Sequence, residues 1–404
     1  MSGRRELRTD RSSSQKLNWT KVIIAILVII IAIASVIVLI VNKNKTGDKI
    51  NKENQNIAEE AKKEQNQESE YKTIEQMLEE FGGEIAEQVN TDTYYINKED
   101  KTYTAYVNDE IVEGKIVPWN GEAKEPAVDE AGNINIYTAE ELKWIADKVI
   151  KGEKNFNGVT ITLRQHIDLS GRKNEEGKWE GNQWDSAIGF LDELPKKEET
   201  KSENKVEEQP VEDESVDVTN ENLKRFAGVF DGNGFCIRGL YINISKRYQG
   251  LFGISSGVIQ NLTIKNSSIN GGNGVGAIVG INDGKLVNCR VHNTEVTGVS
   301  KTGGIVGIAM SGSYLENCTT SDNCMISGGD YTGGIAGYVN NNSSIRMCEN
   351  EAIISGNNFV GGTIGVAFYG TNVESTVNRS NCIIGEKYVG GIVGYSRSPN
   401  RKMY

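Results

Sequence analysis

The chain has 404 residues, of which 37% are hydrophobic and 7% aromatic, with 45 Gly and only 5 Pro. This composition excludes large helical cores, because glycine is a poor helix former and apolar residues are scarce. The net charge of −11 argues against nucleic-acid binding. The six Cys form no C-x-x-C pair, and His166 and His292 stand in no H-E-x-x-H motif. We therefore predict no zinc ribbon, no zincin protease, and no bound metal or cofactor.

The first predicted element is a membrane span. Val22 to Val41 is a run of 20 residues whose only polar member is Ser35. A helix of this length covers about 30 Å, the thickness of the bilayer hydrocarbon. The run is longer than the apolar core of a usual signal peptide, and no small-x-small cleavage site follows it, which favours an uncleaved signal anchor over a cleaved signal.

Basic residues flank this span unequally. Six precede it and four follow it, namely Arg4, Arg5, Arg8, Arg11, Lys16 and Lys21, then Lys43, Lys45, Lys49 and Lys52. The first span of a chain usually keeps its N-terminal positive residues in the cytoplasm. We predict a cytoplasmic tail at 1–21, a single transmembrane helix at 22–41 that contacts the lipid bilayer, and an extracellular remainder in the cell membrane.

A polar stalk is predicted over residues 42–90. Its first part is rich in Lys, Asn, Glu and Gln and has almost nothing to bury. Apolar residues then recur at helical spacing, interrupted by Gly82-Gly83: Ile74, Met77, Leu78, Phe81 and Ile85. Residues 91–133 alternate in places, which predicts a small β segment of unassigned fold.

A glycine-framed motif repeats through the second half of the chain. Its copies end at Gly253, Gly280, Gly307, Gly337, Gly365 and Gly394, in steps of 27, 27, 30, 28 and 29 residues. One apolar patch between copies is led by Ile259, Leu286, Leu315, Ile345 and Val373, and another contains Ile269, Val296, Ile326, Ile354 and Ile384. Such short units bury their apolar face only when stacked. We therefore predict an all-β fold, a right-handed parallel β-helix over 134–404, with one repeat per coil.

Equivalent positions around one bend support this register. Asn261, Asn288 and Asn317 would stack there, because Asn tolerates left-handed backbone and its amides bond from coil to coil. The next position, Leu262, Cys289, Cys318 and Cys348, would point inward, and the preceding one, Gln260, Val287, Glu316, Arg346 and Glu374, outward. Neighbours about 4.8 Å apart are too distant for a disulfide, so we predict buried free thiols.

The glycine-framed copies, from Gly276-Ala-Ile-Val-Gly280 to Gly390-Gly-Ile-Val-Gly394, resemble the GLUG motif of bacterial surface proteins. The segment upstream, with Ile136-Tyr-Thr-Ala-Glu-Glu-Leu142, is similar to the N-terminal part of IgA-specific metalloendopeptidases, without their protease domain. The resemblance covers about 134–189 and 223–395 and implies a short capping helix before the first coils. The residues agree: Thr138 and Glu141 form a capping box, and the apolar face is Leu142, Ile145, Ala146 and Val149.

Residues 190–222 interrupt this pattern. The stretch holds 12 acidic and 4 basic residues, which predicts a disordered acidic loop inserted between two coils. A cation-binding role is the less favoured reading. The chain stops ten residues after Gly394 without a visible cap, so we expect either an artificial end or a covering subunit.

The candidate catalytic residues are few. Glycoside hydrolysis needs two carboxylates across a cleft, whereas Asp231 stands in an Asp-Gly-Asn-Gly turn and Glu295 and Asp322 lack a recognisable partner. We therefore predict no catalytic residues and a non-catalytic surface module for adhesion, binding or scaffolding. Its expected partner is a cell-wall or host polysaccharide or a surface protein. A carbohydrate-active β-helix enzyme and a truncated remnant of an IgA-protease-like protein remain the alternatives.

Overall fold

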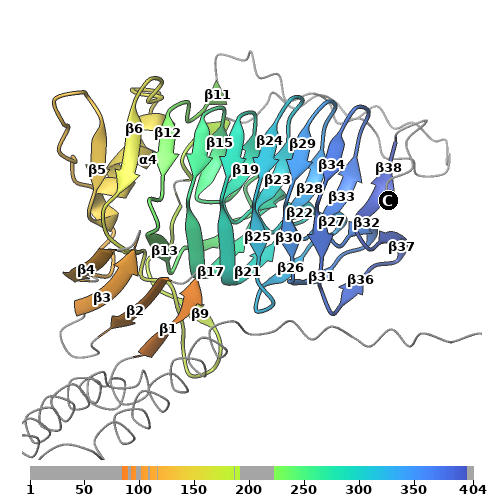
Figure 1. Cartoon of the computed structure of the whole chain (residues 1–404), viewed down its shortest axis with the longest axis horizontal. Coiled ribbons are helices and arrows are strands. Elements are labelled where there is room, and N and C mark those ends of the chain that lie inside the picture. The colour runs from red at the N-terminus through yellow and green to blue at the C-terminus, as the bar shows by residue number, and fades with distance from the viewer. Residues whose placement is uncertain are drawn as a thin grey trace, which may run out of the picture. The chain divides into compact units, whose positions relative to one another are not determined.

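The protein is described by a computed structural model for residues 84–89, 92–96, 102–107, 110–115, 117–185, 187–191 and 223–397. These residues form a small antiparallel sheet and a long parallel β-solenoid (Figure 1). The predicted tail, the Val22 to Val41 span and the stalk up to residue 83 lie outside them. Among the described residues no helix has the length and apolar character needed to cross a bilayer.

The antiparallel sheet has four strands in chain order: β1 (Glu84–Val89), β2 (Asp92–Ile96), β3 (Thr102–Val107) and β4 (Glu110–Lys115). It confirms a β segment but corrects its start, since the predicted helical stalk is wrong from Glu84 onward. Gly82-Gly83 is unfavourable in a helix, and β1 pairs with the β-forming residues Tyr94, Tyr95 and Ile96 of β2.

One sheet of the solenoid takes a single strand from each of eight coils. Its strands are β5 (Ile134–Ile136), β6 (Thr160–Leu163), β12 (Val229–Asp231), β16 (Val258–Gln260), β20 (Lys285–Val287), β24 (Tyr314–Glu316), β29 (Ser344–Arg346) and β34 (Asn372–Glu374). They pair in sequence order and in parallel, as a β-helix requires. The parallel solenoid is therefore confirmed, and the handedness of its winding stays a prediction.

The next sheet around each coil has eleven strands. They are β7 (Ile167–Asp168), β13 (Cys236–Arg238), β14 (Tyr241–Asn243), β17 (Thr263–Asn270), β21 (Arg290–Thr297), β25 (Thr319–Thr320), β26 (Met325–Ser327), β30 (Glu349–Asn350), β31 (Ile353–Ser355), β35 (Val377–Asn378) and β36 (Ile383–Ile384). From Thr319 onward the long strand of each coil is split into two short ones.

Two further sheets flank the glycine-framed motifs. The strands before the motif corner form a five-stranded sheet: β18 (Asn273–Gly276), β22 (Ser300–Gly303), β27 (Asp330–Gly333), β32 (Asn358–Gly361) and β37 (Lys387–Gly390). The strands after it form a six-stranded sheet: β15 (Phe252–Ser255), β19 (Val279–Asn282), β23 (Val306–Ala309), β28 (Ala336–Val339), β33 (Ile364–Ala367) and β38 (Val393–Ser396).

Two short antiparallel pairs complete the described strands. β8 (Arg172–Lys173) pairs with β9 (Trp179–Glu180), and β10 (Phe190–Leu191) pairs with β11 (Leu223–Lys224). The β10–β11 pair brings the two ends of the acidic insertion together, while residues 192–222 lie outside the described part of the chain.

The predicted apolar columns are present. Ile259, Leu286, Leu315 and Ile345 pair in register and are each 0% exposed. The second column is confirmed as far as Ile354, but its last member is wrong. Ile354 pairs with Ile383, while Ile384 pairs with Ser355 and is exposed. The side-chain period of a strand is two, so this one-residue difference turns Ile384 outward.

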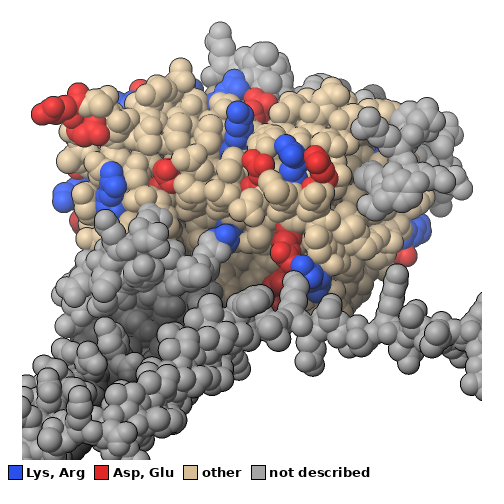
Figure 2. All heavy atoms as spheres, in the orientation of Figure 1, with Lys and Arg blue, Asp and Glu red and all other residues tan. Residues whose placement is uncertain are grey.

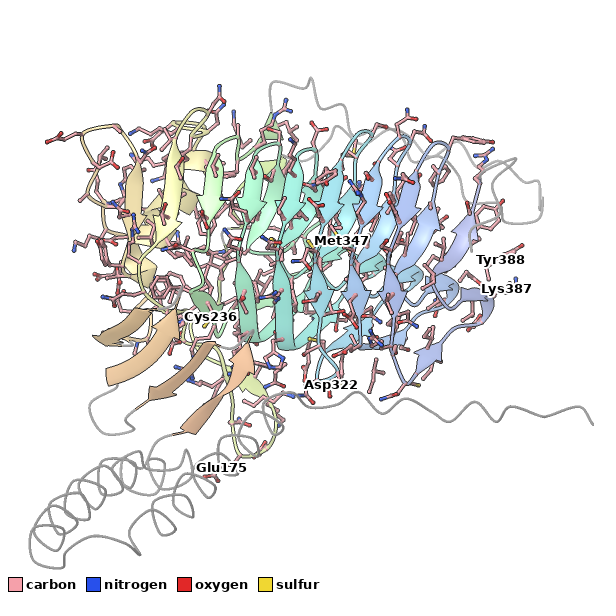
Figure 3. All side chains as sticks on the ribbon, in the orientation of Figure 1. Glu175, Cys236, Asp322, Met347, Lys387 and Tyr388 are labelled. Atoms are coloured by element: carbon pink, nitrogen blue, oxygen red, sulfur yellow. The ribbon has the colours of Figure 1, made fainter. Side chains whose placement is uncertain are left out.

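The predicted asparagine ladder is also confirmed. Asn288 Nδ2 donates to Asn261 Oδ1 at 3.1 Å, and Asn317 Nδ2 donates to Asn288 Oδ1 at 2.8 Å. All three residues have a positive φ of 51–54°, the left-handed conformation that Asn tolerates. The same bend is occupied by Met347 (labelled in Figure 3) in the following coil, at φ 50°, where the ladder ends.

The glycines of the repeated motif are required by close backbone contacts at the corner. A Cβ on Gly361, the first glycine of its copy, would lie 1.8 Å from the carbonyl oxygen of Ile364. A Cβ on Gly307, the last glycine of its copy, would lie 2.5 Å from the carbonyl carbon of Gly274. The motif glycines therefore form a sharp corner at which two strands meet with no side chain between them.

The capping helix is α4 (Ala139–Ile150), between β5 and β6 at the N-terminal end of the solenoid (Figure 1). Its capping box is formed as predicted, with Thr138 and Glu141 each bonded to the backbone of the other. The face of Leu142, Ile145, Ala146 and Val149 is buried in the main core. The solenoid also starts earlier than residue 134, because Pro118 bridges to Asp168 and Trp119 is buried against Trp184.

Candidate binding groove

A shallow open groove of about 440 Å³ crosses five adjacent coils of the solenoid. It lies at the corner that precedes the eight-stranded sheet, and its lining is Asn157, Gly158, Ala227, Gly228, Val229, Ser256, Gly257, Val258, Asp283, Gly284, Lys285 and Gly312. Because these residues come from neighbouring coils, the groove runs along the solenoid axis. Four coil steps of ~4.8 Å give it a length of about 19 Å.

The groove follows from a difference in turn length. Only two residues separate β15 from β16 (Ser256-Gly257) and β19 from β20 (Asp283-Gly284). The corresponding turns before β24, β29 and β34 have four residues: 310–313, 340–343 and 368–371. Ala227-Gly228 is the equivalent two-residue turn before β12, because Phe226 bridges to Ser255 at the end of β15. We call the coils of β12, β16 and β20 the short-turn coils, and those of β24, β29 and β34 the long-turn coils. The groove lies over the short-turn coils and ends at Gly312, in the first long turn.

The glycines of the groove have no room for a side chain, because they are packed against the preceding coil. A Cβ on Gly284 would lie 2.0 Å from the carbonyl oxygen of Gly257, and one on Gly257 would lie 2.1 Å from that of Gly228. These glycines are thus needed for stacking whether or not a ligand binds. This stacking buries Gly228 and Gly257, while Ala227, Ser256 and Gly284 stay partly exposed along the groove.

Two charged side chains, Asp283 and Lys285, line the groove, and Arg225 pairs with Asp283. Arg225 Nη1 lies 3.6 Å from Asp283 Oδ2, with both side chains partly buried. Burial raises the pKa of Asp283, and the Arg225 charge opposes this shift. Lys285 lies on the rim and is exposed. The groove therefore offers a carboxylate, a guanidinium and an ammonium group next to an uncharged floor.

A second apolar cluster lies outside the main core and is closed by its own side chains. Residues with positive φ before the glycine corner stack along the axis: the rings of Tyr331 and Phe359 lie 5.1 Å apart, and those of Phe359 and Tyr388 lie 4.7 Å apart. Phe359 is 2% exposed, whereas Tyr388, at the end of the column in Figure 3, is 42% exposed. The stacked rings cover one another, so this column presents no row of free ring faces.

Asp231, which the sequence offers as a candidate catalytic acid, has a structural role. Its Oδ1 accepts from the Asn233 backbone N–H at 2.8 Å and from Asn261 Nδ2 at 3.0 Å, and its Oδ2 accepts from Gln260 Nε2 at 2.8 Å. The carboxylate therefore shapes its turn and begins the asparagine ladder. This agrees with the turn interpretation of the Asp-Gly-Asn-Gly sequence.

Of the other acids considered from sequence, Glu295 also has structural partners. Glu295 accepts from Trp179 Nε1 at 2.8 Å and pairs with Lys173 of the β8–β9 hairpin. Asp322, labelled in Figure 3, lies in the loop between β25 and β26. In the outward column, Arg346 Nε lies 3.1 Å from Glu374 Oε2, as the alternating charges predict.

The cysteines Cys289, Cys318 and Cys348 are free and buried, which confirms their predicted role as core thiols. Hydrogen bonding with Cys289 and burial raise the pKa of the Cys318 thiol, so it stays protonated. His166 is buried beside Cys236, with Nδ1 accepting from the Cys236 backbone N–H at 3.1 Å. Burial and the Lys265 and Arg238 charges lower the pKa of His166 to about 3, which keeps its ring neutral.

Comparison with known proteins gives one likeness. The fold resembles a protein from Bacteroides ovatus described as a candidate immunoglobulin A1 protease, with 15% sequence identity and a TM-score of 0.39. The match covers 67% of this chain and 87% of that protein. No protein-family model and no curated protein matches the chain.

The groove was not found by sequence reasoning. Its signal was nevertheless present, because the steps between glycine motifs lengthen from 27 to 30 residues where the first long turn occurs. Asp283 and Lys285 fall within an Asn-Asp-Gly-Lys turn that has no catalytic signature. Arg225 precedes Asp283 by 58 positions in the sequence, so their contact becomes visible only once the register of the coils is known.

Proposed function

We propose that this protein is a membrane-anchored extracellular β-solenoid that binds or displays a surface partner and does not catalyse a reaction. Its partner would be a cell-wall or host polysaccharide or a surface protein. The observation that carries the proposal is the groove over the short-turn coils, which is built from five coils and has a volume of about 440 Å³. Such an extended site suits a long partner more than a compact one.

The state of the acidic residues supports binding rather than hydrolysis. Glycoside hydrolysis uses two carboxylates that face each other across the scissile bond. Among the groove-lining residues Asp283 is the one carboxylate, and it is paired with Arg225. The resemblance of the glycine motifs to GLUG repeats of bacterial surface proteins points the same way.

The membrane anchor rests on the sequence. Val22 to Val41 has the length and composition of a transmembrane helix, and its basic N-terminal flank favours a cytoplasmic N-terminus. With this orientation the solenoid would face the cell exterior on a polar stalk. The anchor would hold the groove near the cell surface and raise its effective concentration toward wall polymers.

Cell fractionation with protease treatment of intact cells tests the anchor. The full chain should sediment with membranes, and external protease should degrade the solenoid. The double substitution Ile29→Lys and Ile30→Lys should release the chain from the membrane, because each central charge costs about 3 kcal/mol of insertion free energy. The matched control, Asn54→Lys with Gln55→Lys in the stalk, should stay membrane-bound. A wild-type chain in the soluble fraction would overturn the anchor.

Incubation with purified wall and host polysaccharides tests binding against catalysis. The detergent-solubilised full chain should bind at least one polymer or a host-cell surface protein and leave the polymer length unchanged on size-exclusion chromatography. Shortening of the polymer that disappears in the Asp283→Asn variant would contradict the non-catalytic proposal and make the protein a carbohydrate-active enzyme.

A further inference from the structure

We propose that the groove over the short-turn coils is a binding site for a single linear polysaccharide chain that runs parallel to the solenoid axis. This inference rests on the proposed function and deepens it by naming the site and the ligand class. The groove shape, the pairing of the strands below the groove and the chemistry of its lining support this ligand class.

The shape favours a linear polymer. The groove is open along its length and crosses five coils, about 19 Å at ~4.8 Å per coil, without an enclosed end pocket. A compact ligand usually occupies a concave pocket that surrounds most of its surface. An extended chain instead gains from repeated shallow contacts, and each of the five coils contributes a glycine turn to the groove.

The hydrogen bonding of the floor disfavours a peptide. A peptide ligand commonly adds as a strand to a free sheet edge. Here the N–H groups that border the groove are already paired with the preceding coil: Val258 donates to Gly228 O, Lys285 to Gly257 O and Tyr314 to Gly284 O, at 3.0–3.1 Å. No strand edge along this part of the described chain is free for such addition, so recognition falls to the side chains.

The lining matches the two surfaces of a sugar ring. The partly exposed floor, formed by Ala227, Val258 and Gly284, is uncharged, which suits the C–H face of a pyranose. The Ser256 hydroxyl and the Asp283 carboxylate stand beside it, and Arg225 next to Asp283 adds donors for ring hydroxyls. Lys285 gives the rim one further positive charge, which tolerates an acidic sugar.

The surrounding surface does not favour a polyelectrolyte. In Figure 2 the charged side chains of the described solenoid lie in small groups, several of mixed sign, on a mostly uncharged face and form no continuous strip of one sign. Binding through an extended phosphate backbone or another polyanion would require such a strip. A hydroxyl-rich polymer, held by neutral contacts and a few polar groups, fits this surface better.

Co-sedimentation of the detergent-solubilised full chain with insoluble chitin, cellulose and peptidoglycan sacculi tests the inference. Wild type should bind at least one of these polymers. Ser256→Tyr places a ring in the groove and should weaken that binding at least tenfold. The matched control is Ser327→Tyr, the same substitution at an exposed serine of β26 outside the groove lining, which should change binding less than twofold. Asp283→Asn should weaken binding at least threefold without filling the groove.

The outcomes separate this inference from the proposed function. Equal binding by Ser256→Tyr and Ser327→Tyr, with both variants unfolding at the wild-type temperature, would overturn the groove as the site while leaving a binding protein. Binding of a surface protein but of no polysaccharide would overturn the ligand class. Failure to bind any polymer or surface protein would overturn both proposals.

Discussion

The short-turn and long-turn coils differ at one corner and share almost everything else. Both have the apolar column that contains Leu286 and Leu315, and both have the same glycine corner. The long turns add two residues and send Met310 and Phe368 into the outer apolar cluster. The short turns add none, and the groove lies over them. In a repeat protein, a surface site can therefore arise from a change in loop length while the core stays constant.

The largest expected effect tests whether the two kinds of coil share one core. Leu286→Ala in a short-turn coil and Leu315→Ala in a long-turn coil should each lower the free energy of unfolding by about 3–4 kcal/mol, because both side chains are 0% exposed. Chemical denaturation measures both values. A cost that differs between them by more than about 2 kcal/mol would break the comparison, since the residues are neighbours in one column.

The next effect concerns the coil of β6 and β7, which differs from the short-turn and long-turn coils because it buries a histidine, His166. The folded pKa of His166 is about 3, below the usual value near 6.5, so the unfolded chain binds one more proton between these values. The contribution of this group to stability should therefore be complete above pH 6.5 and fall by about 3 kcal/mol toward pH 4.5.

Denaturation curves of wild type and His166→Gln as a function of pH measure this contribution as a difference. The variant should lose the part of the acid dependence due to His166 while keeping that of the carboxylates. His292→Gln is the control, because that ring is only part-buried and its Nδ1 contacts Ser321 Oγ at 2.7 Å. Parallel curves for wild type and His166→Gln would contradict a neutral buried His166.

A smaller effect concerns the asparagine ladder, which crosses from short-turn into long-turn coils. Asn288→Ala should lower the free energy of unfolding by about 1–2 kcal/mol, since it removes both ladder bonds and places Ala at φ 54°. Met347→Asn should raise it by about 0.5–1 kcal/mol, because Asn suits φ 50° and extends the ladder to the next coil. Thermal unfolding compares the two, and a destabilising Met347→Asn would contradict the assigned register.

The smallest expected effect on stability comes from lengthening a short turn. Inserting Ser-Gly between Asp283 and Gly284 gives this turn the four-residue length of turn 310–313 and keeps Gly284, so it should change the free energy of unfolding by less than about 1 kcal/mol, because lengthening a surface loop costs little entropy. The circular dichroism spectrum should stay that of wild type, while polysaccharide binding should be lost. A chain that no longer folds would show that the short turns serve the core and not only the groove.

The repeats made the interior predictable, because inward positions must stack to be buried. Leu286, Leu315 and Asn288 were located by spacing alone, and their contacts follow from one register. Ile384 was misplaced since the final coil shifts by one residue, which motif spacing does not resolve. Ile85 was assigned to a helix because a short apolar pattern fits both periods, and strand pairing with Tyr95 decides the outcome. The Arg225–Asp283 contact depends on which coils are neighbours across the insertion, which local sequence does not encode.

The central claim is that corresponding residues of successive coils lie in axial columns, so that the groove is continuous. Dipolar electron paramagnetic resonance between spin labels at Lys285 and Asn372 tests it, in a background where the partly exposed Cys382 is replaced by Ser. These positions are linked through Tyr314 and Ser344, and three steps of ~4.8 Å give about 14 Å between their backbones. A label distance in this range, widened only by the label arms, is the predicted result. A separation of about 30 Å or more would contradict the stacked coils and the groove built on them.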